Sequence, residues 1–394
     1  MISRNLRHLR VFLAVAETGS VTQAADRCRV SQPAVTQALN KLEQNAGGAL
    51  FDRTRRGFFT TARGDVLLDR VRRACAMLDA ALEDVSPRLV LTATFAQLNA
   101  LIAVRETENY TLAARRLNLA QPTVHRAVSQ LEREAGRALF ERTSFGMIPT
   151  RQARNLSLRA QLALAELDQA DADLAELDGR EVGRIVVGAL PLSRSVILPR
   201  ALTRFRTRRP VQDITVIDGL YSELLSGLRR GDIDFILGAL RDPLPISDVV
   251  QEPLFSDRLT IVCRPGHPLA DCPGLTPAIL ARMAWVVARK GTPTRAQFDA
   301  CFADGAAPAS IIETGSVLLL REILLGSDHL GCISTAQADA EISKGLLARM
   351  SVDVDWDRRP IGLTTRAGWV PTRGQALLLD LIREAATEAR QEKG

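Results

Sequence analysis

Residues 24–43 read A-A-D-R-C-R-V-S-Q-P-A-V-T-Q-A-L-N-K-L-E, which predicts a short helix and a second helix joined by a turn at Arg29-Val30. Ser31 is placed to cap the second helix, because its hydroxyl can accept a hydrogen bond from a backbone N–H of the first turn. A further helix is expected upstream, from Leu9 to a stop at Gly19. The apolar residues that recur at helical spacing and predict the buried face of the last helix are Val35, Leu39 and Leu42.

The opposite face of that last helix carries short amide and hydroxyl side chains. A helix fits the major groove of DNA, where such groups can hydrogen-bond to base edges, and Thr36 and Gln37 are the best candidates. Residues 50–60 then read as two short strands around a basic turn, a wing whose arginines can contact phosphates. The predicted DNA-contacting residues are Ser31, Gln32, Pro33, Thr36, Gln37, Asn40, Lys41, Arg53, Arg55 and Arg56.

The same pattern occurs a second time, shifted by 89 positions without a gap. Leu9 to Thr61 aligns with Leu98 to Thr150, and 24 of these 53 positions are identical. Residues 1–64 hold ten Lys/Arg and four Asp/Glu, and residues 90–153 hold eight and five, so the rest of the chain carries a net −3 within a total of +6. Basic charge confined to the repeats is typical of a polyanion-binding region. The alternative is that these charges only solubilise small helical domains.

The motif A-A-x-x-x-x-V-S-Q-P-A-V-T-x-x-x-x-x-L-E, followed by L-F-x-R and T-T-x-x-G, resembles the winged helix-turn-helix of LysR-type transcriptional regulators. In that family the segment matching Ser31 to Glu43 is the recognition helix. The resemblance implies a transcription regulator that binds double-stranded DNA, takes up a small-molecule effector and assembles into a homo-oligomer, either a dimer or a tetramer. RNA polymerase is a further expected partner.

The second copy departs from this pattern at its cap and its wing. Ala120 stands where the first copy has Ser31, and Ser144-Phe145 replaces Arg55-Arg56. Loss of a cap costs about 1 kcal/mol, and loss of two arginines weakens the salt-dependent part of DNA binding. Two interpretations stay open: a second reader with a different base preference, or a copy kept for packing, dimerisation or protein interaction. The predicted DNA contacts of this copy are Gln121, Pro122, Thr123, His125, Arg126, Ser129 and Arg142.

A heptad seam follows each copy, which predicts two linker helices that pair with other helices. The first seam consists of Leu67, Val71, Ala74, Leu78, Ala81 and Val85. The second is predicted to mediate dimerisation and consists of Leu156, Ala160, Ala163, Leu167, Ala170 and Leu174. A LysR-type regulator has one linker helix and dimerises through it, so this chain would have two. The alternative is that each helix packs only on its own domain.

From Arg184 onward the sequence alternates between apolar strands and helices, which predicts an α/β unit with a mainly parallel sheet. The strand near 361–364 and the helix near 374–385 are expected to return to the first of two lobes. The phrases G-A-L-P, L-P-R-A-L-x-R-F, G-D-I-D-F, R-P-G-H-P-L and G-T-P-x-R resemble the effector-binding part of the same family, especially its branch near galactose-binding-protein and protocatechuate regulators. That part has the two-lobed fold of periplasmic solute-binding proteins.

The expected fold class is therefore multidomain: two mainly α winged helix-turn-helix domains with linker helices, then an α/β two-lobed effector domain like a type 2 periplasmic-binding protein. The predicted boundaries are 1–64 and 90–153 for the two winged copies, 65–86 and 154–178 for the linker helices, 182–257 with 348–390 for effector lobe 1, and 258–347 for effector lobe 2.

Ligands of such folds lie between the lobes, where strand ends and helix N-termini present N–H groups. Hydroxyls at these junctions, together with helix dipoles, suit a small carboxylate, an aromatic acid or a sugar. The predicted effector-binding residues are Ser193, Tyr221, Ser222, Thr292, Thr294 and Ser316. Ser and Thr also cap helices in any fold, so a purely structural role stays open for each. Arg289, Lys290 and Arg295 either hold an anion or face solvent.

Other classes of function have little support in the sequence. The six cysteines form no C-x-x-C pair and the four histidines lie far apart, so neither a metal site nor a cofactor is expected. No nucleophile elbow, Walker loop or Rossmann fingerprint is present, and we expect no enzymatic activity. The amino terminus has no apolar signal region, and no apolar run approaches the roughly 18 residues needed to span a bilayer. A cytoplasmic protein without a membrane partner is expected.

Overall fold

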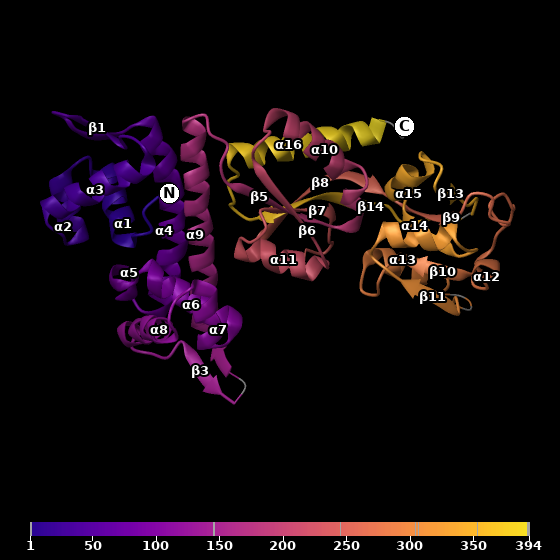
Figure 1. Cartoon of the computed structure of the whole chain (residues 1–394), viewed down its shortest axis with the longest axis horizontal. Helices are drawn as coiled ribbons and strands as arrows, with labels where there is room; N and C mark the ends of the chain where they lie inside the picture. Colours follow the sequence, from indigo (N-terminus) through magenta and orange to yellow (C-terminus); the bar gives the residue numbers. More distant parts are fainter. Residues whose placement is uncertain are drawn as a thin grey trace. The chain divides into compact units, whose positions relative to one another are not determined.

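The computed structural model describes residues 2–144, 146–244, 246–303, 305, 307–352 and 354–391. The chain divides into two compact units, Met1–Gly183 and Arg184–Gly394 (Figure 1). None of the helices described is both long enough and apolar enough to cross a membrane.

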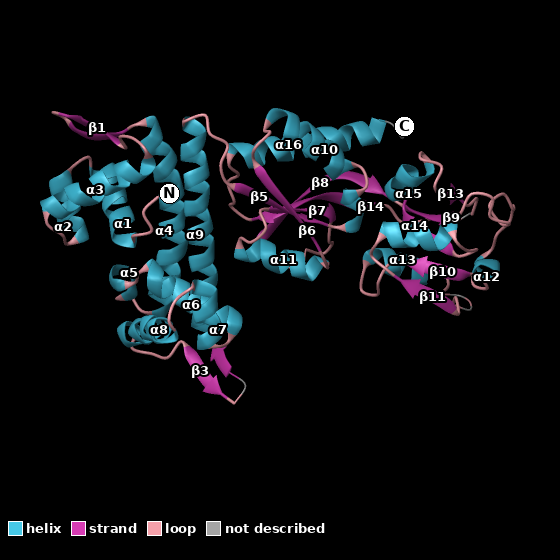
Figure 2. Ribbon diagram, in the orientation of Figure 1, coloured by secondary structure: helices cyan, strands magenta, loops and turns pink. Residues whose placement is uncertain are grey.

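The amino-terminal unit contains one order of elements twice: three helices, a two-stranded hairpin and a long helix (Figure 2). The first copy comprises α1 (Leu6–Thr18), α2 (Val21–Cys28), α3 (Gln32–Ala46), β1 (Phe51–Thr54), β2 (Gly57–Thr60) and α4 (Ala62–Val85). The second comprises α6 (Phe95–Thr107), α7 (Tyr110–Leu117), α8 (Gln121–Ala135), β3 (Phe140–Thr143), β4 (Gly146–Pro149) and α9 (Arg151–Leu177). The short helix α5 (Leu89–Thr92) lies between the copies.

The turns of the first copy form where the sequence predicts them. Gly19 ends α1 in the left-handed region with φ 64°, and the Ser20 side chain caps α2. Arg29 ends α2, also left-handed, with φ 55°. The Ser31 hydroxyl then accepts a hydrogen bond from the backbone N–H of Ala34 at 3.4 Å, and α3 begins. These caps fix where α2 ends and α3 begins, because each satisfies a backbone group that the helix itself leaves unpaired.

The long helices α4 and α9 lie side by side and run antiparallel (Figure 1). Arg63, near the start of α4, pairs with Asp178 just beyond the end of α9, whereas Arg73, further along α4, pairs with Glu166. All twelve predicted heptad residues are buried, at 4% exposure or less. One apolar cluster contains both seams together with the helices of both winged copies.

This pairing corrects the predicted dimerisation interface. Helix α9 contacts α4 of the same chain, and its seam is already buried there: Leu156, Ala160, Ala163, Leu167, Ala170 and Leu174. A second chain cannot contact a face that is already covered. The duplication supplies the partner helix within one chain, a possibility that the heptad pattern alone does not distinguish from pairing between chains.

The carboxy-terminal unit contains two five-stranded sheets with the orders β6-β5-β7-β14-β8 and β11-β10-β12-β9-β13. The first sheet and its helices are β5 (Arg184–Ala189), η1 (Pro191–Arg194), α10 (Ile197–Arg208), β6 (Asp213–Asp218), α11 (Tyr221–Arg230), β7 (Phe235–Ala239), β8 (Val249–Asp257), β14 (Arg359–Arg366) and α16 (Arg373–Gln391). The second sheet and its helices are β9 (Leu259–Cys263), α12 (Pro277–Leu280), β10 (Ala284–Val287), α13 (Pro293–Ala300), β11 (Ser310–Glu313), α14 (Val317–Leu325), β12 (Leu330–Ser334), α15 (Thr335–Ile342) and β13 (Ala348–Arg349).

Each sheet is mixed rather than mainly parallel. β5 runs parallel to β6 and β7, and β10 runs parallel to β11 and β12, but the remaining strands join antiparallel. β14 pairs with β7 and β8, so the predicted return of the chain to the first sheet is confirmed. β13 pairs with β9 of the second sheet, so residues 348–349 belong to lobe 2 and not to lobe 1 as predicted.

Candidate functional site

The exposed face of α3 contains the predicted base-reading residues of the first copy. The structure exposes every one of them: Ser31, Gln32, Pro33, Thr36, Gln37, Asn40 and Lys41. Val35, Leu39 and Leu42 lie on the buried face, at 1% exposure or less. The Thr36 hydroxyl donates to the Gln32 carbonyl at 3.2 Å, which holds this side chain against the helix.

The wing of the first copy is attached to the reading helix through Glu43. One oxygen of this carboxylate accepts the backbone N–H of Leu50 at 3.0 Å, and the other accepts from Arg53 Nη2 at 2.9 Å. Arg53 Nη2 also donates to Asn40 Oδ1 at 3.2 Å. Glu43 therefore positions the wing, a role that the sequence marks only by an L-E pair present in both copies. Arg55, like Arg56, is exposed at the turn of the hairpin.

In the second copy Glu132 has the same positioning role, because its Oε1 accepts the backbone N–H groups of Leu139 and Phe140 at 2.8 and 3.3 Å. The cap differs, since Ala120 has extended backbone but makes no side-chain hydrogen bond to α8. Arg142, the counterpart of Arg53, is exposed. Phe145, one of the residues that replace the wing arginines, lies outside the described residues.

The reading face of the second copy has an aromatic support that the sequence did not predict. The His125 ring lies 5.1 Å from the ring of Tyr110, centroid to centroid. Burial, together with the Glu132 carboxylate, raises the pKa of Tyr110 to about 12, so Tyr110 stays neutral at physiological pH. The reading-face residues Gln121, Pro122, Thr123, His125 and Arg126 are exposed, and Ser129 is half-buried. A shallow groove on this face is lined by Gln121, Pro122, His125, Arg126, Ser129 and Arg133.

The carboxy-terminal unit has a cavity of about 810 Å³ lined by residues of both lobes. Of the six predicted effector-binding residues, four line it: Tyr221, Thr292, Thr294 and Ser316. Ser193 does not line it, because its buried hydroxyl donates to the Leu190 carbonyl at 2.8 Å. Ser222 also lies elsewhere, exposed on α11, with its carbonyl accepting from Ser226. The prediction was wrong for these two serines.

Two of the predicted hydroxyls have structural roles as well. Thr292 caps α13 by accepting the backbone N–H of Arg295 at 3.2 Å, and Ser316 caps α14 by accepting that of Leu319 at 3.2 Å. The capping alternative thus holds for both, although each lies at the cavity wall. Arg289 lines the cavity, whereas Arg295 forms ion pairs with Asp299 and Glu313.

Two arginines that the sequence did not indicate line the cavity, and they are the residues that best define which ligand it could bind. The Arg241 guanidinium stacks over the Tyr221 ring at 4.5 Å, and Arg359 Nη1 donates to Thr294 Oγ1 at 2.7 Å. Burial lowers the pKa of both guanidinium groups. Arg241 Nη1 and Arg359 Nε are buried with no hydrogen-bond partner among the described residues. A small anion between the lobes would satisfy these N–H groups.

Among the described residues, no group of three or more His, Cys, Asp or Glu side chains is placed so that it could hold a metal ion.

Sequence families match both units. Residues 178–387 match the family described as "LysR substrate binding domain", and residues 6–65 and 95–154 each match "Bacterial regulatory helix-turn-helix protein, lysR family". The chain belongs to the LysR family. The family resemblance predicted from the motifs is thereby confirmed.

Similar LysR proteins include two named transcriptional regulators. The HTH-type transcriptional regulator GalR of Pseudomonas putida (strain KT2440) is 36% identical over 394 residues, which cover 98% of each chain. The HTH-type transcriptional regulator PcaQ of Agrobacterium fabrum is 30% identical over 303 residues, which cover 75% of this chain and 95% of PcaQ.

Solved LysR structures share the fold. A full-length OxyR variant from Pseudomonas aeruginosa has a TM-score of 0.55 with 21% identity, and the match covers 74% of this chain and 95% of that one. The full-length CbnR, solved with its target DNA, has a TM-score of 0.50 with 17% identity, and the match covers 74% of this chain and 99% of that one.

Proposed function

We propose that this chain is a sequence-specific DNA-binding transcription regulator that responds to a small anionic effector bound between the two lobes of its carboxy-terminal unit. The observation that carries the proposal is the fully exposed polar face of α3 beside a wing held by Glu43. Family members named as transcriptional regulators support it, as does the relative CbnR with its target DNA. RNA polymerase at the promoter is a further proposed partner of such a regulator.

Base reading in the first copy is assigned to Thr36 and Gln37, with Ser31, Asn40 and Lys41 beside them. Arg53, Arg55 and Arg56 would contact phosphates, which orient the domain without reading sequence. Gln32 and Pro33 complete the first turn of α3, whose N-terminus favours an anion. In the second copy, the proposed contacts are Gln121, Pro122, Thr123, His125, Arg126, Ser129 and Arg142.

The competing proposal is that only the first copy binds DNA and the second is an interaction module. Gel shifts with one genomic binding fragment compare Thr36→Ala/Gln37→Ala with the matched pair His125→Ala/Arg126→Ala. Comparable losses of affinity favour two DNA-binding copies. A loss confined to the first pair favours the interaction module. If the unaltered chain binds random and genomic DNA equally, sequence-specific regulation is rejected.

For the effector, carboxylates, aromatic acids and sugars were the expected classes, and Arg241 with Arg359 favours the two anionic classes. A ligand at roughly 100 times its Kd stabilises the folded state by about 2.7 kcal/mol, so a thermal-shift screen will detect it. Arg359→Gln should abolish the shift for an acid. A sugar that stabilises the chain and its Arg359→Gln variant equally would contradict the anionic assignment.

Effector binding is proposed to change the population of DNA-bound arrangements, because a ligand shifts an equilibrium only toward the state it binds better. DNase footprints with and without saturating acid test this step. A footprint of unchanged length at saturation counts against it.

A further inference from the structure

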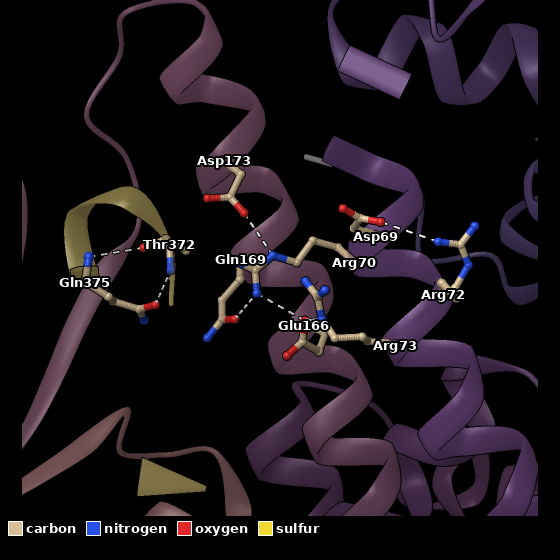
Figure 3. A network of polar contacts seen from close by, with 9 residues as sticks. All are labelled: Asp69, Arg70, Arg72, Arg73, Glu166, Gln169, Asp173, Thr372 and Gln375. Carbon is tan, nitrogen blue, oxygen red and sulfur yellow. Dashed lines mark hydrogen bonds and ion pairs between the residues drawn. The ribbon is translucent and has the colours of Figure 1, made fainter. Parts of the chain in front are cut away.

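The two linker helices are joined by a buried polar network as well as by their apolar seam (Figure 3). The Arg70 side chain of α4 is only 3% exposed and points toward α9. Its Nη1 donates to Glu166 at 3.1 Å and to Gln169 Oε1 at 2.6 Å, and its Nε donates to Asp173 at 2.8 Å. Arg73 Nε adds a second bond to Glu166 at 3.2 Å. A buried charge is tolerated only when it is paired, so this network specifies which helix lies beside α4.

The ion pairs that join the two copies share one polarity: in each of those described, the first copy provides the cation and the second provides the anion. The cations are Arg4, Arg63, Arg70 and Arg73, and the anions are Glu166, Asp168, Asp171, Asp173 and Asp178. Opposite charges across a helix pair select unlike partners over like ones.

The 89-residue shift shows what pairing between identical copies would lose. The positions in the second copy that correspond to the four arginines are Ala93, Gln152, Arg159 and Leu162. The positions in the first copy that correspond to the five acids are Met77, Asp79, Leu82, Asp84 and Leu89. A pair of first copies would lack three of the five acids, and a pair of second copies would lack three of the four arginines. Only the pairing of one copy with the other keeps the complete set.

This pairing places the two reading helices in a defined relation. Each winged copy precedes the start of its own long helix, and α4 and α9 run antiparallel. The two copies are therefore related by an approximate two-fold rotation and lie at opposite ends of the helix pair (Figure 1). Both belong to one apolar cluster, so they form a single body. Two-fold related readers match half-sites in inverted orientation.

The two reading faces are chemically different. His125 stands where the first copy has Thr36, and Arg126 stands where it has Gln37. Arg pairs preferentially with guanine and Gln with adenine, so these faces favour different bases.

We propose that a single chain reads a bipartite DNA site made of two unlike half-sites in inverted orientation, one contacted by α3 and the other by α8. This inference rests on the proposed DNA-binding function. One chain then recognises a complete site, and this site is asymmetric. Two identical winged copies would instead bind a palindrome.

The first experiment selects binding sites from random double-stranded DNA with the full chain. The expected result is a two-part motif with unlike halves, in which Thr36→Ala/Gln37→Ala relaxes one half and His125→Ala/Arg126→Ala relaxes the other. Replacing one half by a copy of the other should weaken binding about tenfold or more. A palindromic motif, or two variants that alter the same half, overturns the inference. If the unaltered chain enriches no sequence, the proposed function itself fails.

The second experiment measures stoichiometry on one selected duplex by sedimentation. One chain per bipartite site is expected, so a dimer of chains should bind two duplexes. Two chains on each single duplex overturn the inference. Arg159→Ala, at the exposed position of the second copy that corresponds to Arg70, is the control and should leave the one-to-one ratio unchanged.

Discussion

At the scale of single residues, the cap of α8 is a site where stability can be regained. Ala120 has φ −72° and ψ 140°, which is already the conformation of an N-cap residue. Ala120→Ser should therefore stabilise the amino-terminal unit by about 1 kcal/mol, because its hydroxyl would accept a backbone N–H of the first turn. Urea unfolding measures the gain. Ser31→Ala, which removes the cap of α3, is the matched control and should lose a similar amount; an Ala120→Ser variant with unchanged stability would contradict the argument.

Arg70 provides a second prediction at this scale. Arg70→Ala should destabilise the amino-terminal unit by about 3–5 kcal/mol, because it leaves Glu166 and Asp173 without their buried partner. The control is Arg159→Ala, the exposed counterpart in the second copy, which should change stability by less than about 0.5 kcal/mol. Urea unfolding of both variants tests the difference. Equal effects would show that the buried network does not hold the helix pair.

The positions of the functional side chains could be predicted from the sequence on helices, and less well in loops. The periodic apolar face of α3 separates its buried side from its reading side, so the exposed residues of the first copy follow from sequence alone. Arg241 lies in the loop after β7 and Arg359 is the first residue of β14, and nothing in the sequence shows that the fold brings them to one cavity. Ser193 had the right location along the chain but the wrong orientation, because its turn directs the hydroxyl to Leu190.

At the scale of elements, most helices and strands follow from apolar periodicity, and the exceptions have physical causes. In β8 the apolar pattern is interrupted by Pro253, and proline is tolerated there since β8 is an edge strand. β13 has only two residues, too few for any pattern. The heptads predicted that α9 pairs with a helix but not which one, because an apolar seam carries no information about chain identity. The charges around Arg70 identify the partner as the long helix of the other copy, and the structure places that helix in the same chain.

The edge strand β8 is also held by α16, which leads to a pH prediction. Glu252 accepts bonds from Arg383 Nε and Nη2, both at 2.8 Å, and this pairing lowers the pKa of the Glu252 carboxyl. The stabilisation is therefore present at neutral pH and is lost as the pH falls below the unfolded-state pKa of about 4.3 and through the folded-state value. Both side chains are more than 40% exposed, so the pair contributes less than about 1 kcal/mol.

Glu252→Gln tests this pair. The variant should be slightly less stable than the unaltered chain at pH 7, and the difference should shrink toward acidic pH, where the unaltered carboxyl is also protonated. Urea unfolding across this range measures both. A stability gap that stays constant with pH would contradict the assignment.

At the scale of the whole molecule, the duplication changes what one chain can do. Solved relatives match about three quarters of this chain along nearly their whole length, and one winged copy with its long helix accounts for the excess. The pairing of α4 with α9 makes the amino-terminal unit complete in itself. Any homo-oligomer must then form through surfaces other than the α9 seam.

The number of winged copies in each chain leads to a prediction about the oligomer. A dimer of chains should present four winged copies with unequal affinity for DNA, since the second copy lacks a cap and two wing arginines. Because the helix pair lies within one chain, the unfolding midpoint of the amino-terminal unit should not change over about a hundred-fold range of chain concentration, whereas pairing between chains would raise it with concentration. Light scattering gives the number of chains, and footprinting gives the length of DNA protected. A dimer that protects one short site would show that the second winged copy does not contact DNA. Protection of two bipartite sites would show that all four winged copies bind DNA.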